Sequence, residues 1–167
     1  MRIIVFSDSH NRDSNMRRAL ELNRGRFDLC IHLGDGCREF ELLGEEYSDI
    51  PFVTVNGNGE DFLGSARVNE TVLDLDGYRI LVTHGHRYNV KFGTTNLEYH
   101  AIERECDVVL YGHTHIPDNR YLPDIMGRKL YVFNPGSISR PPLGHKAGFG
   151  VIEISGKGIS LNNAYIQ

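Results

Sequence analysis

Two histidines two positions apart stand out in the sequence GHTH at residues 112–115. In an extended segment, side chains at i and i+2 point to the same side, so His113 and His115 project together while Thr114 turns away. Imidazole is the commonest metal ligand among protein side chains, so the pair indicates a metal site. An isolated HxH pattern is more often only a polar turn, and the rest of the chain must decide between these interpretations.

Further carboxylate, imidazole and amide side chains stand at the ends of other short apolar runs. In open α/β sheets, functional groups gather just outside the carboxyl ends of the strands, so these side chains are expected to meet at one edge. Together with the GHTH pair, five loops supply the candidate metal ligands Asp8, His10, Asp35, Asn58, His84, His113 and His115. Five such loops are hard to explain as solvated turns.

The chemistry of this set indicates the type of metal site. Seven ligands exceed the four of a tetrahedral zinc, and none is a thiolate, which disfavours a structural zinc site. Mixed oxygen and nitrogen ligands suit two ions that share a carboxylate, with Mn²⁺ as the first expectation and Fe, Ni²⁺ or Zn²⁺ as alternatives. Two ions about 3.5–4 Å apart clamp both oxygens of an in-line displacement and acidify a bridging water. That chemistry serves phosphoester hydrolysis.

The elements that must position these residues change in pattern along the chain. The first half reads as parallel βαβ units, and Asp76-Gly77 predicts a hairpin that opens a mostly antiparallel second half. The predicted strands are 2–7, 28–35, 51–57, the hairpin 70–84, 107–112, 129–136, 148–155 and 158–167, and the predicted helices are 12–24, 37–47 and 95–105. With no repeat and no linker composition, we expect one mixed α/β domain over residues 1–167.

Length, charge and cysteine content narrow the class of protein. A chain of 167 residues is long enough to bury one core. The net charge of −4 argues against a general nucleic-acid-binding surface, although a metal can still attract a nucleotide. The apolar run at the N-terminus is too short to span a membrane and has no signal-peptide pattern. Three cysteines without CxxC spacing indicate reduced thiols and a cytoplasmic protein.

Five motifs in a fixed order resemble those of the calcineurin-like metallophosphoesterases: DSH (8–10), GDG (34–36), GNGE (57–60), THGH (83–86) and GHTH (112–115). The short chain and the late NPGSISRP (134–141) resemble the small, single-domain phosphodiesterase branch of that superfamily. The resemblance implies a four-layer α-β-β-α sandwich and hydrolysis by a hydroxide that bridges two metals.

The resemblance also implies a role for each ligand. Asp8, His10 and His115 would hold the first metal, and Asn58, His84 and His113 the second. Asp35 would bridge both ions. The catalytic chemistry is thereby assigned to Asp35, Asn58 and His84.

Position 59 departs from the family pattern. Many members read GNH in this motif, and that histidine protonates the leaving group, whereas this chain has Gly59. General acid catalysis is worth roughly 10²–10⁴-fold. Its absence predicts a phosphodiesterase that prefers activated or aryl-like leaving groups, or one that takes a proton from another donor.

Several further residues have two open interpretations. Asn11, Glu60 and His86 adjoin ligands and either orient them or contact substrate, or are ordinary loop residues. His32 lies inside a predicted strand and is expected to be a core histidine with satisfied hydrogen bonds. Three arginines are candidates for substrate phosphate, although a solvated arginine is the commoner case: Arg87, Arg120 and Arg140.

The alternative to an enzyme is a protein-interaction scaffold on the same fold, because the superfamily includes a small trafficking subunit with a degraded metal site. Here all the ligand positions hold competent residues, which favours the enzyme. The expected partner is a small phosphoester or nucleotide-type substrate, with no stable nucleic acid and no membrane. A homo-oligomer is a further expectation, since exposed edge strands can pair across subunits.

Overall fold

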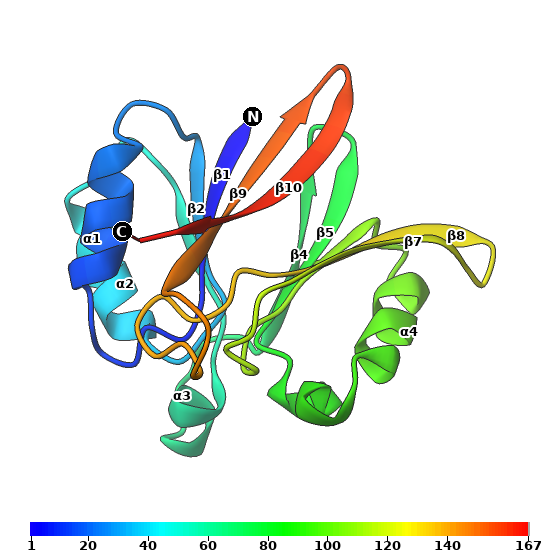
Figure 1. Cartoon of the computed structure of the whole chain (residues 1–167), viewed down its shortest axis with the longest axis horizontal. Coiled ribbons are helices and arrows are strands. Elements are labelled where there is room, and N and C mark those ends of the chain that lie inside the picture. The colour runs from blue at the N-terminus through cyan, green and yellow to red at the C-terminus, as the bar shows by residue number, and fades with distance from the viewer. Residues whose placement is uncertain (167) are drawn as a thin grey trace.

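Two five-stranded sheets pack face to face in this computed structural model, which describes residues 1–166 (Figure 1). The first sheet has the order β10-β9-β1-β2-β3. Its strands are β1 (Arg2–Phe6), β2 (Leu29–His32), β3 (Phe52–Thr54), β9 (Gly148–Ser155) and β10 (Gly158–Tyr165). Strands β1, β2 and β3 are parallel, joined by the helices α1 (Ser14–Leu22) and α2 (Cys37–Glu45). This half matches the predicted βαβ pattern.

The second sheet has the order β4-β5-β6-β8-β7. Its strands are β4 (Glu70–Leu75), β5 (Tyr78–Thr83), β6 (Val108–Leu110), β7 (Asp118–Ile125) and β8 (Arg128–Asn134). The hairpin at Asp76-Gly77 is confirmed, since both residues have positive φ, 46° and 86°, as a tight hairpin turn requires. Helix α4 (Thr95–Glu103) connects β5 to β6.

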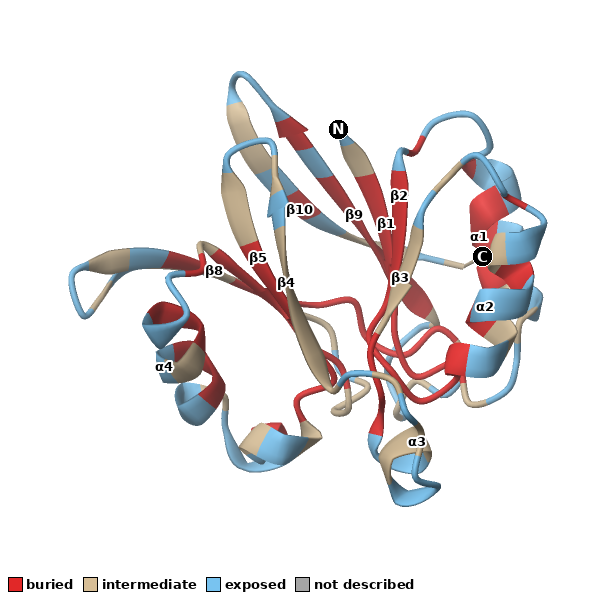
Figure 2. Ribbon diagram, turned by 180° about the vertical axis from the view of Figure 1, so that it is seen from behind, coloured by how far each residue is buried: buried red, intermediate tan, exposed pale blue. Residues whose placement is uncertain are grey.

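Three hydrophobic clusters hold four layers together, which confirms the predicted α-β-β-α arrangement. Because side chains alternate along a strand, Ile3 and Val5 of β1 face the second sheet, while Ile4 and Phe6 face α1 and α2. In β6, Val109 packs in the cluster beneath α4. Figure 2 shows β1 and β2 buried along most of their length, between the helices on one side and the other sheet on the other.

The expected antiparallel second half is wrong in part. Strands β5, β6 and β8 are parallel, because α4 forms a crossover that returns the chain in the same direction. Strand β7 was not predicted: it is an edge strand of mixed polar residues, with an irregularity between Leu122 and Ile125 where Pro123 stands. Three short helices also went unpredicted: α3 (Asn58–Phe62), η1 (His86–Tyr88) and η2 (Val90–Phe92).

The structure also shows the state of the cysteines and the character of the helices. Cys30, Cys37 and Cys106 are free and buried, and burial raises the pKa of each thiol. They are therefore part of the core. Within residues 1–166, none of the helices has the length and apolar character needed to cross a membrane.

Candidate metal centre

All seven predicted ligands lie at the carboxyl ends of strands, in loops from both sheets. Asp8 and His10 follow β1, Asp35 follows β2, and Asn58 begins α3 after β3. His84 directly follows β5, and the GHTH histidines follow β6. The two sheets therefore bring their ligand loops to one edge of the sandwich.

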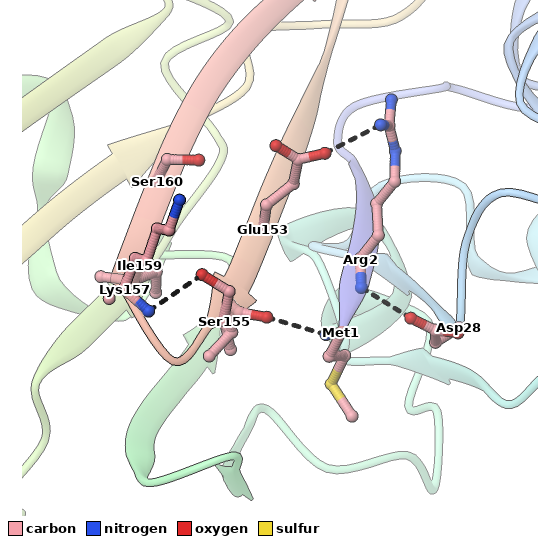
Figure 3. Close-up of a pocket in the computed structure, with 10 residues that line it drawn as sticks. Met1, Arg2, Asp28, Glu153, Ser155, Lys157, Ile159 and Ser160 are labelled. Atoms are coloured by element: carbon pink, nitrogen blue, oxygen red, sulfur yellow. Dashed lines mark hydrogen bonds and ion pairs between the residues drawn. The ribbon is translucent and has the colours of Figure 1, made fainter.

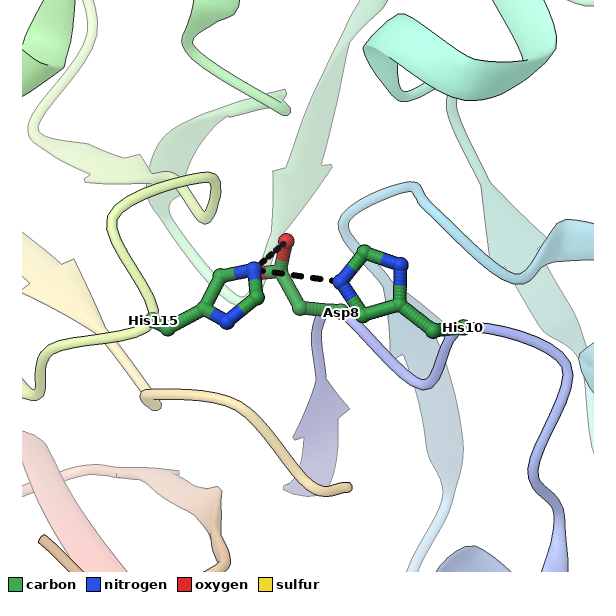
Figure 4. Close-up of side chains that lie close together, drawn as sticks. All are labelled: Asp8, His10 and His115. Atoms are coloured by element: carbon green, nitrogen blue, oxygen red, sulfur yellow. Dashed lines mark hydrogen bonds and ion pairs between the residues drawn. The ribbon is translucent and has the colours of Figure 1, made fainter. Parts of the chain in front are cut away.

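The first cluster consists of Asp8, His10 and His115, whose ligand atoms lie within 4.8 Å of one another (Figure 4). Nε2 of His10 lies 3.1 Å from Nε2 of His115, and Oδ1 of Asp8 lies 3.1 Å from the same His115 nitrogen. The predicted first metal site thus has its three side chains converging on one small volume.

The second cluster gathers around Nε2 of His84. Asp8 and Asp35 place ligand atoms within the same 4.8 Å limit of this residue. Oδ1 of Asn58 lies 3.3 Å from that nitrogen, and Nδ1 of His113 lies 3.2 Å from it. Asp8 belongs to both clusters, whereas Asp35 belongs to the second alone. The bridging role of Asp35 therefore stays a prediction.

Backbone carbonyls fix the tautomers of two of the histidines. Nδ1 of His84 lies 2.6 Å from the carbonyl of Leu33, and Nδ1 of His115 lies 2.8 Å from the carbonyl of Arg140. A carbonyl only accepts, so both Nδ1 atoms carry the proton. The lone pair of each neutral ring is then on Nε2, which faces the cluster, as metal-binding histidines require.

Asp8 offers the clearest sign that the site suits a cation. Its Oδ2 accepts hydrogen bonds from the Ser7 hydroxyl and the His113 backbone N–H. Its Oδ1 is buried and has no hydrogen-bond donor among residues 1–166 as long as the His115 ring is neutral, because Nε2 of that ring, 3.1 Å away, then carries no hydrogen. A buried carboxylate oxygen without a donor is costly unless a cation meets it. The residues present therefore fit a divalent metal ion.

The titration behaviour of the site agrees with a set of metal ligands. Burial raises the pKa of Asp8, but the hydrogen bond and charge of His115 and the charge of His84 outweigh it and hold that pKa well below its usual range. Burial lowers the pKa of His10, and it lowers the pKa of His113 to about 4. The hydrogen bond to Asp8 raises the pKa of His115. Protons therefore compete with a metal more strongly at His115 than at His10 or His113.

Five of the seven ligand positions have left-handed backbone. Asp8, His10, Asp35, His113 and His115 have φ between 47° and 67°. Residues with side chains seldom adopt this conformation, although Asp and His tolerate it better than most, and it concentrates at functional sites. The loops are thus held in an unfavourable conformation that aims the side chains at the clusters.

Glu60 holds two of these loops together. Its carboxylate accepts backbone N–H groups from Asp35, Gly36, Cys37 and Gly57 at 2.7–3.1 Å. Burial raises its pKa, but these four donors outweigh burial and lower the pKa to about 2. Glu60 therefore fixes the Asp35 loop against the start of α3, which carries Asn58. The glycine at 57 allows this close approach, because an added Cβ would lie 2.1 Å from Oδ1 of Asp35.

The NPGSISRP segment supports the site from the other side. Asn134 donates to the Gly112 carbonyl, and the hydroxyls of Ser137 and Ser139 donate to the Asp8 carbonyl at 2.8 and 3.1 Å. These bonds hold the segment against the loops after β6 and β1. Gly112 is required here, since an added Cβ would lie 1.9 Å from the Ser7 hydroxyl oxygen.

His32 is a core histidine with satisfied hydrogen bonds, as predicted. Its Nδ1 accepts the Gly34 N–H at 3.1 Å, and its Nε2 lies 3.0 Å from the Ser9 hydroxyl. It thereby ties the loop after β1 to the loop after β2. This role as a link was not predicted from the sequence.

The neutrality of His32 leads to a pH-dependent stability. Burial lowers its pKa from 6.5 to about 4, so the folded state binds this proton less well than the unfolded state does. The stabilisation is present above pH 6.5 and is lost as the pH falls toward 4. Between pH 7 and pH 5, urea unfolding of the metal-free protein should show the parent losing about 2 kcal/mol more than His32→Asn does. His145→Asn, at an exposed histidine, should behave like the parent. Equal losses in parent and His32→Asn would contradict this role.

The structure places Asn11 and His86 beside the ligands. Asn11 lines a hollow at the clusters. The ring of His86 lies 5.3 Å from that of His84 between centroids, and its Nε2 lies 3.3 Å from Asp61. Contact of either residue with substrate stays a prediction.

A second hollow lies at the opposite end of β1, next to the N-terminus (Figure 3). Three of its polar groups are paired: the Arg2 guanidinium donates to Glu153, the Arg2 backbone N–H donates to Asp28, and the amino group of Met1 donates to the Ile154 carbonyl. None of the seven predicted ligands lines this hollow.

Comparison with known proteins supplies the family. The family model described as the calcineurin-like phosphoesterase superfamily domain matches residues 1–157. The chain belongs to this superfamily. The family resemblance read from the five motifs is confirmed.

Individual members of the superfamily are similar over most of the chain. The probable metallophosphoesterase YsnB of Bacillus subtilis is 31% identical over 92% of this chain and 85% of its own length. A phosphodiesterase of Methanocaldococcus jannaschii is 28% identical, over 81% of this chain and 83% of its own. A crystal structure of a predicted phosphoesterase from Streptococcus pneumoniae superposes with a TM-score of 0.80 at 28% identity, covering 98% of this chain and 88% of its own.

Proposed function

We propose that this superfamily member is a divalent-metal-dependent phosphodiesterase with a dinuclear centre. The observation that supports it best is the convergence of the seven side chains of Asp8, His10, Asp35, Asn58, His84, His113 and His115. Among the described residues, the buried Oδ1 of Asp8 has no hydrogen-bond donor while His115 is neutral. Mn²⁺ is the proposed metal, with Fe, Ni²⁺ or Zn²⁺ as alternatives. The proposed substrate is a small or nucleotide-type phosphoester, and the proposed location is the cytoplasm.

The position of each residue indicates which of the two ions it would hold. Asp8, His10 and His115 would hold one ion, and Asp35, Asn58, His84 and His113 the other, with Asp8 and Asp35 the candidates for the shared carboxylate. When bound, the ions would neutralise phosphoryl oxygens and increase the acidity of water. The carbonyls of Leu33 and Arg140 keep His84 and His115 in the ligating tautomer throughout. Ligands held this rigidly can position substrate without reorganisation.

The wall of the adjoining hollow favours a diester with an apolar leaving group. Gly59 lines this hollow and provides no side chain that could donate a proton. Leu63, which is 83% exposed, also lines it. An aryl leaving group gains from contact with Leu63 and departs without a proton.

Substrate preference tests the proposal. With Mn²⁺ added, we expect kcat/KM for an aryl phosphodiester to exceed that for an alkyl phosphomonoester by about 10²-fold or more, because the alkyl alkoxide needs a general acid. Gly59→His should raise alkyl monoester turnover, whereas Gly59→Ala should not. Faster hydrolysis of the alkyl monoester by the parent protein would contradict the proposal. No turnover of any phosphoester with Mn²⁺ would favour the protein-interaction scaffold.

A further inference from the structure

A hollow of about 350 Å³ opens beside the metal-binding clusters, between the loop after β1 and helix α3. Its wall includes His10, Asp35 and Asn58 from the ligand set, together with Arg140. A group bound in this hollow therefore meets the clusters and Arg140 at the same time.

The three arginines considered as phosphate contacts differ in what they already bind. Arg87 pairs with Asp61, with Nη2 to Oδ2 at 2.8 Å. Arg120 pairs with Asp118 and Glu98 at 2.9 and 3.0 Å. Both are thus already paired with acids.

Arg140 is not paired in this way. Among residues 1–166, its guanidinium forms neither an ion pair nor a hydrogen bond, and the side chain is exposed. Two acids line the same hollow. One of these acids, Glu60, already accepts four backbone N–H groups. The other, Asp35, accepts the Gly59 N–H and is a predicted metal ligand. The guanidinium of Arg140 is therefore available to a ligand.

The backbone of Arg140 is anchored to the site. Its N–H donates to the Ser137 hydroxyl at 2.7 Å, and its carbonyl accepts the Nδ1–H of His115 at 2.8 Å. The side chain therefore starts from a fixed point beside a predicted ligand. Substitution of the side chain alone keeps both backbone bonds, so it can be tested without moving His115.

We propose that the guanidinium of Arg140 binds the anionic phosphoryl oxygens of the substrate in this hollow. The proposal rests on the phosphodiesterase function proposed above. A guanidinium presents several N–H donors in one plane and suits two phosphoryl oxygens at once. Because it does not lose its proton in proteins, Arg140 contributes binding and cannot replace the general acid missing at Gly59.

The test compares Arg140→Gln and Arg140→Lys with the parent protein. Arg18→Gln is the matched control, because Arg18 is an exposed arginine on α1 that does not line the hollow. Calorimetry of the Mn²⁺-loaded proteins measures the affinity for inorganic phosphate, and a Mn²⁺ titration measures metal binding. Kinetics with an aryl phosphodiester separate KM from kcat.

In Arg140→Gln, we expect phosphate affinity to fall and KM to rise by about 10–100-fold, the usual effect of losing charge-assisted hydrogen bonds. Mn²⁺ affinity should be unchanged, Arg140→Lys should recover part of the loss, and Arg18→Gln should match the parent. The proposal would be overturned if Arg140→Gln had the phosphate affinity and the KM of the parent. It would also be overturned if a loss of Mn²⁺ binding accounted for the whole effect. If the parent hydrolyses no phosphoester, the proposed function fails, while phosphate calorimetry still decides the role of Arg140.

Discussion

Asp8→Asn should reduce Mn²⁺-dependent phosphodiester hydrolysis by at least about 10³-fold, the largest loss we expect from a single substitution. Asp8 is the residue common to both clusters, and within residues 1–166 its buried Oδ1 has no hydrogen-bond donor while His115 is neutral. An amide at this position has no charge, so it cannot compensate the charge of an ion in either cluster.

The same variant separates metal binding from folding. The amide oxygen can still accept from Ser7 and the His113 N–H, and the amide N–H₂ can donate to Nε2 of His115. The metal-free variant should therefore unfold at a temperature close to that of the metal-free parent, while the rise in Tm on adding Mn²⁺ disappears. Asp49→Asn, at an exposed aspartate outside the clusters, serves as the control. A variant that keeps a tenth of the parent activity, or the full Mn²⁺-induced rise in Tm, would show that Asp8 is not a ligand.

Glu60→Gln should cost about 2–3 kcal/mol in the free energy of unfolding and reduce turnover by about 10–100-fold. The glutamate accepts four backbone N–H groups, whereas a glutamine offers one oxygen and turns its N–H₂ toward donors. Because these bonds hold the loop of Asp35 against the residue before Asn58, their loss should loosen the second cluster. Urea unfolding and steady-state kinetics measure the two effects.

Acid titration provides a second measurement of the Glu60 interaction. Its pKa is about 2 in the folded protein, below the ordinary value of 4.5, so the stabilisation is present above pH 4.5 and is lost as the pH falls toward 2. Glu60→Gln should lose less stability over this range than the parent. Glu45→Gln, at an exposed position on α2, should follow the parent. If Glu60→Gln were as stable and as active as the parent, Glu60 would not support the metal centre.

Residues whose role depends on their own strand were predictable from the sequence. The alternation of Ile3, Ile4, Val5 and Phe6 between two hydrophobic clusters follows from the two-residue period of a strand. Polar residues directly after such runs indicated the ligand edge for the same reason, since the end of a buried strand leads to the functional edge of a sheet.

Features that depend on distant parts of the chain were not predictable. Strand β7 is mostly polar and pairs on one side only, so its sequence lacks the apolar run of a central strand. Glu60 resembles any acid in a turn until the fold brings the N–H groups of residues 35–37 to it. Arg87 and Arg140 look alike in sequence, and they differ only in the fold, which places Arg87 against Asp61 and Arg140 at the hollow beside the clusters.

The left-handed ligand loops have a consequence for how the empty protein behaves. Each such residue costs about 1–2 kcal/mol relative to ordinary backbone, and glycine is free of that cost. A glycine at His10, whose ring is partly buried and makes no hydrogen bond to the backbone among residues 1–166, should therefore give an apoprotein with a higher Tm than the natural chain, yet one that binds its ions less well. At this position, the stability of the metal-free protein favours glycine, whereas metal binding requires histidine. Selection for thermal stability alone would therefore replace this ligand.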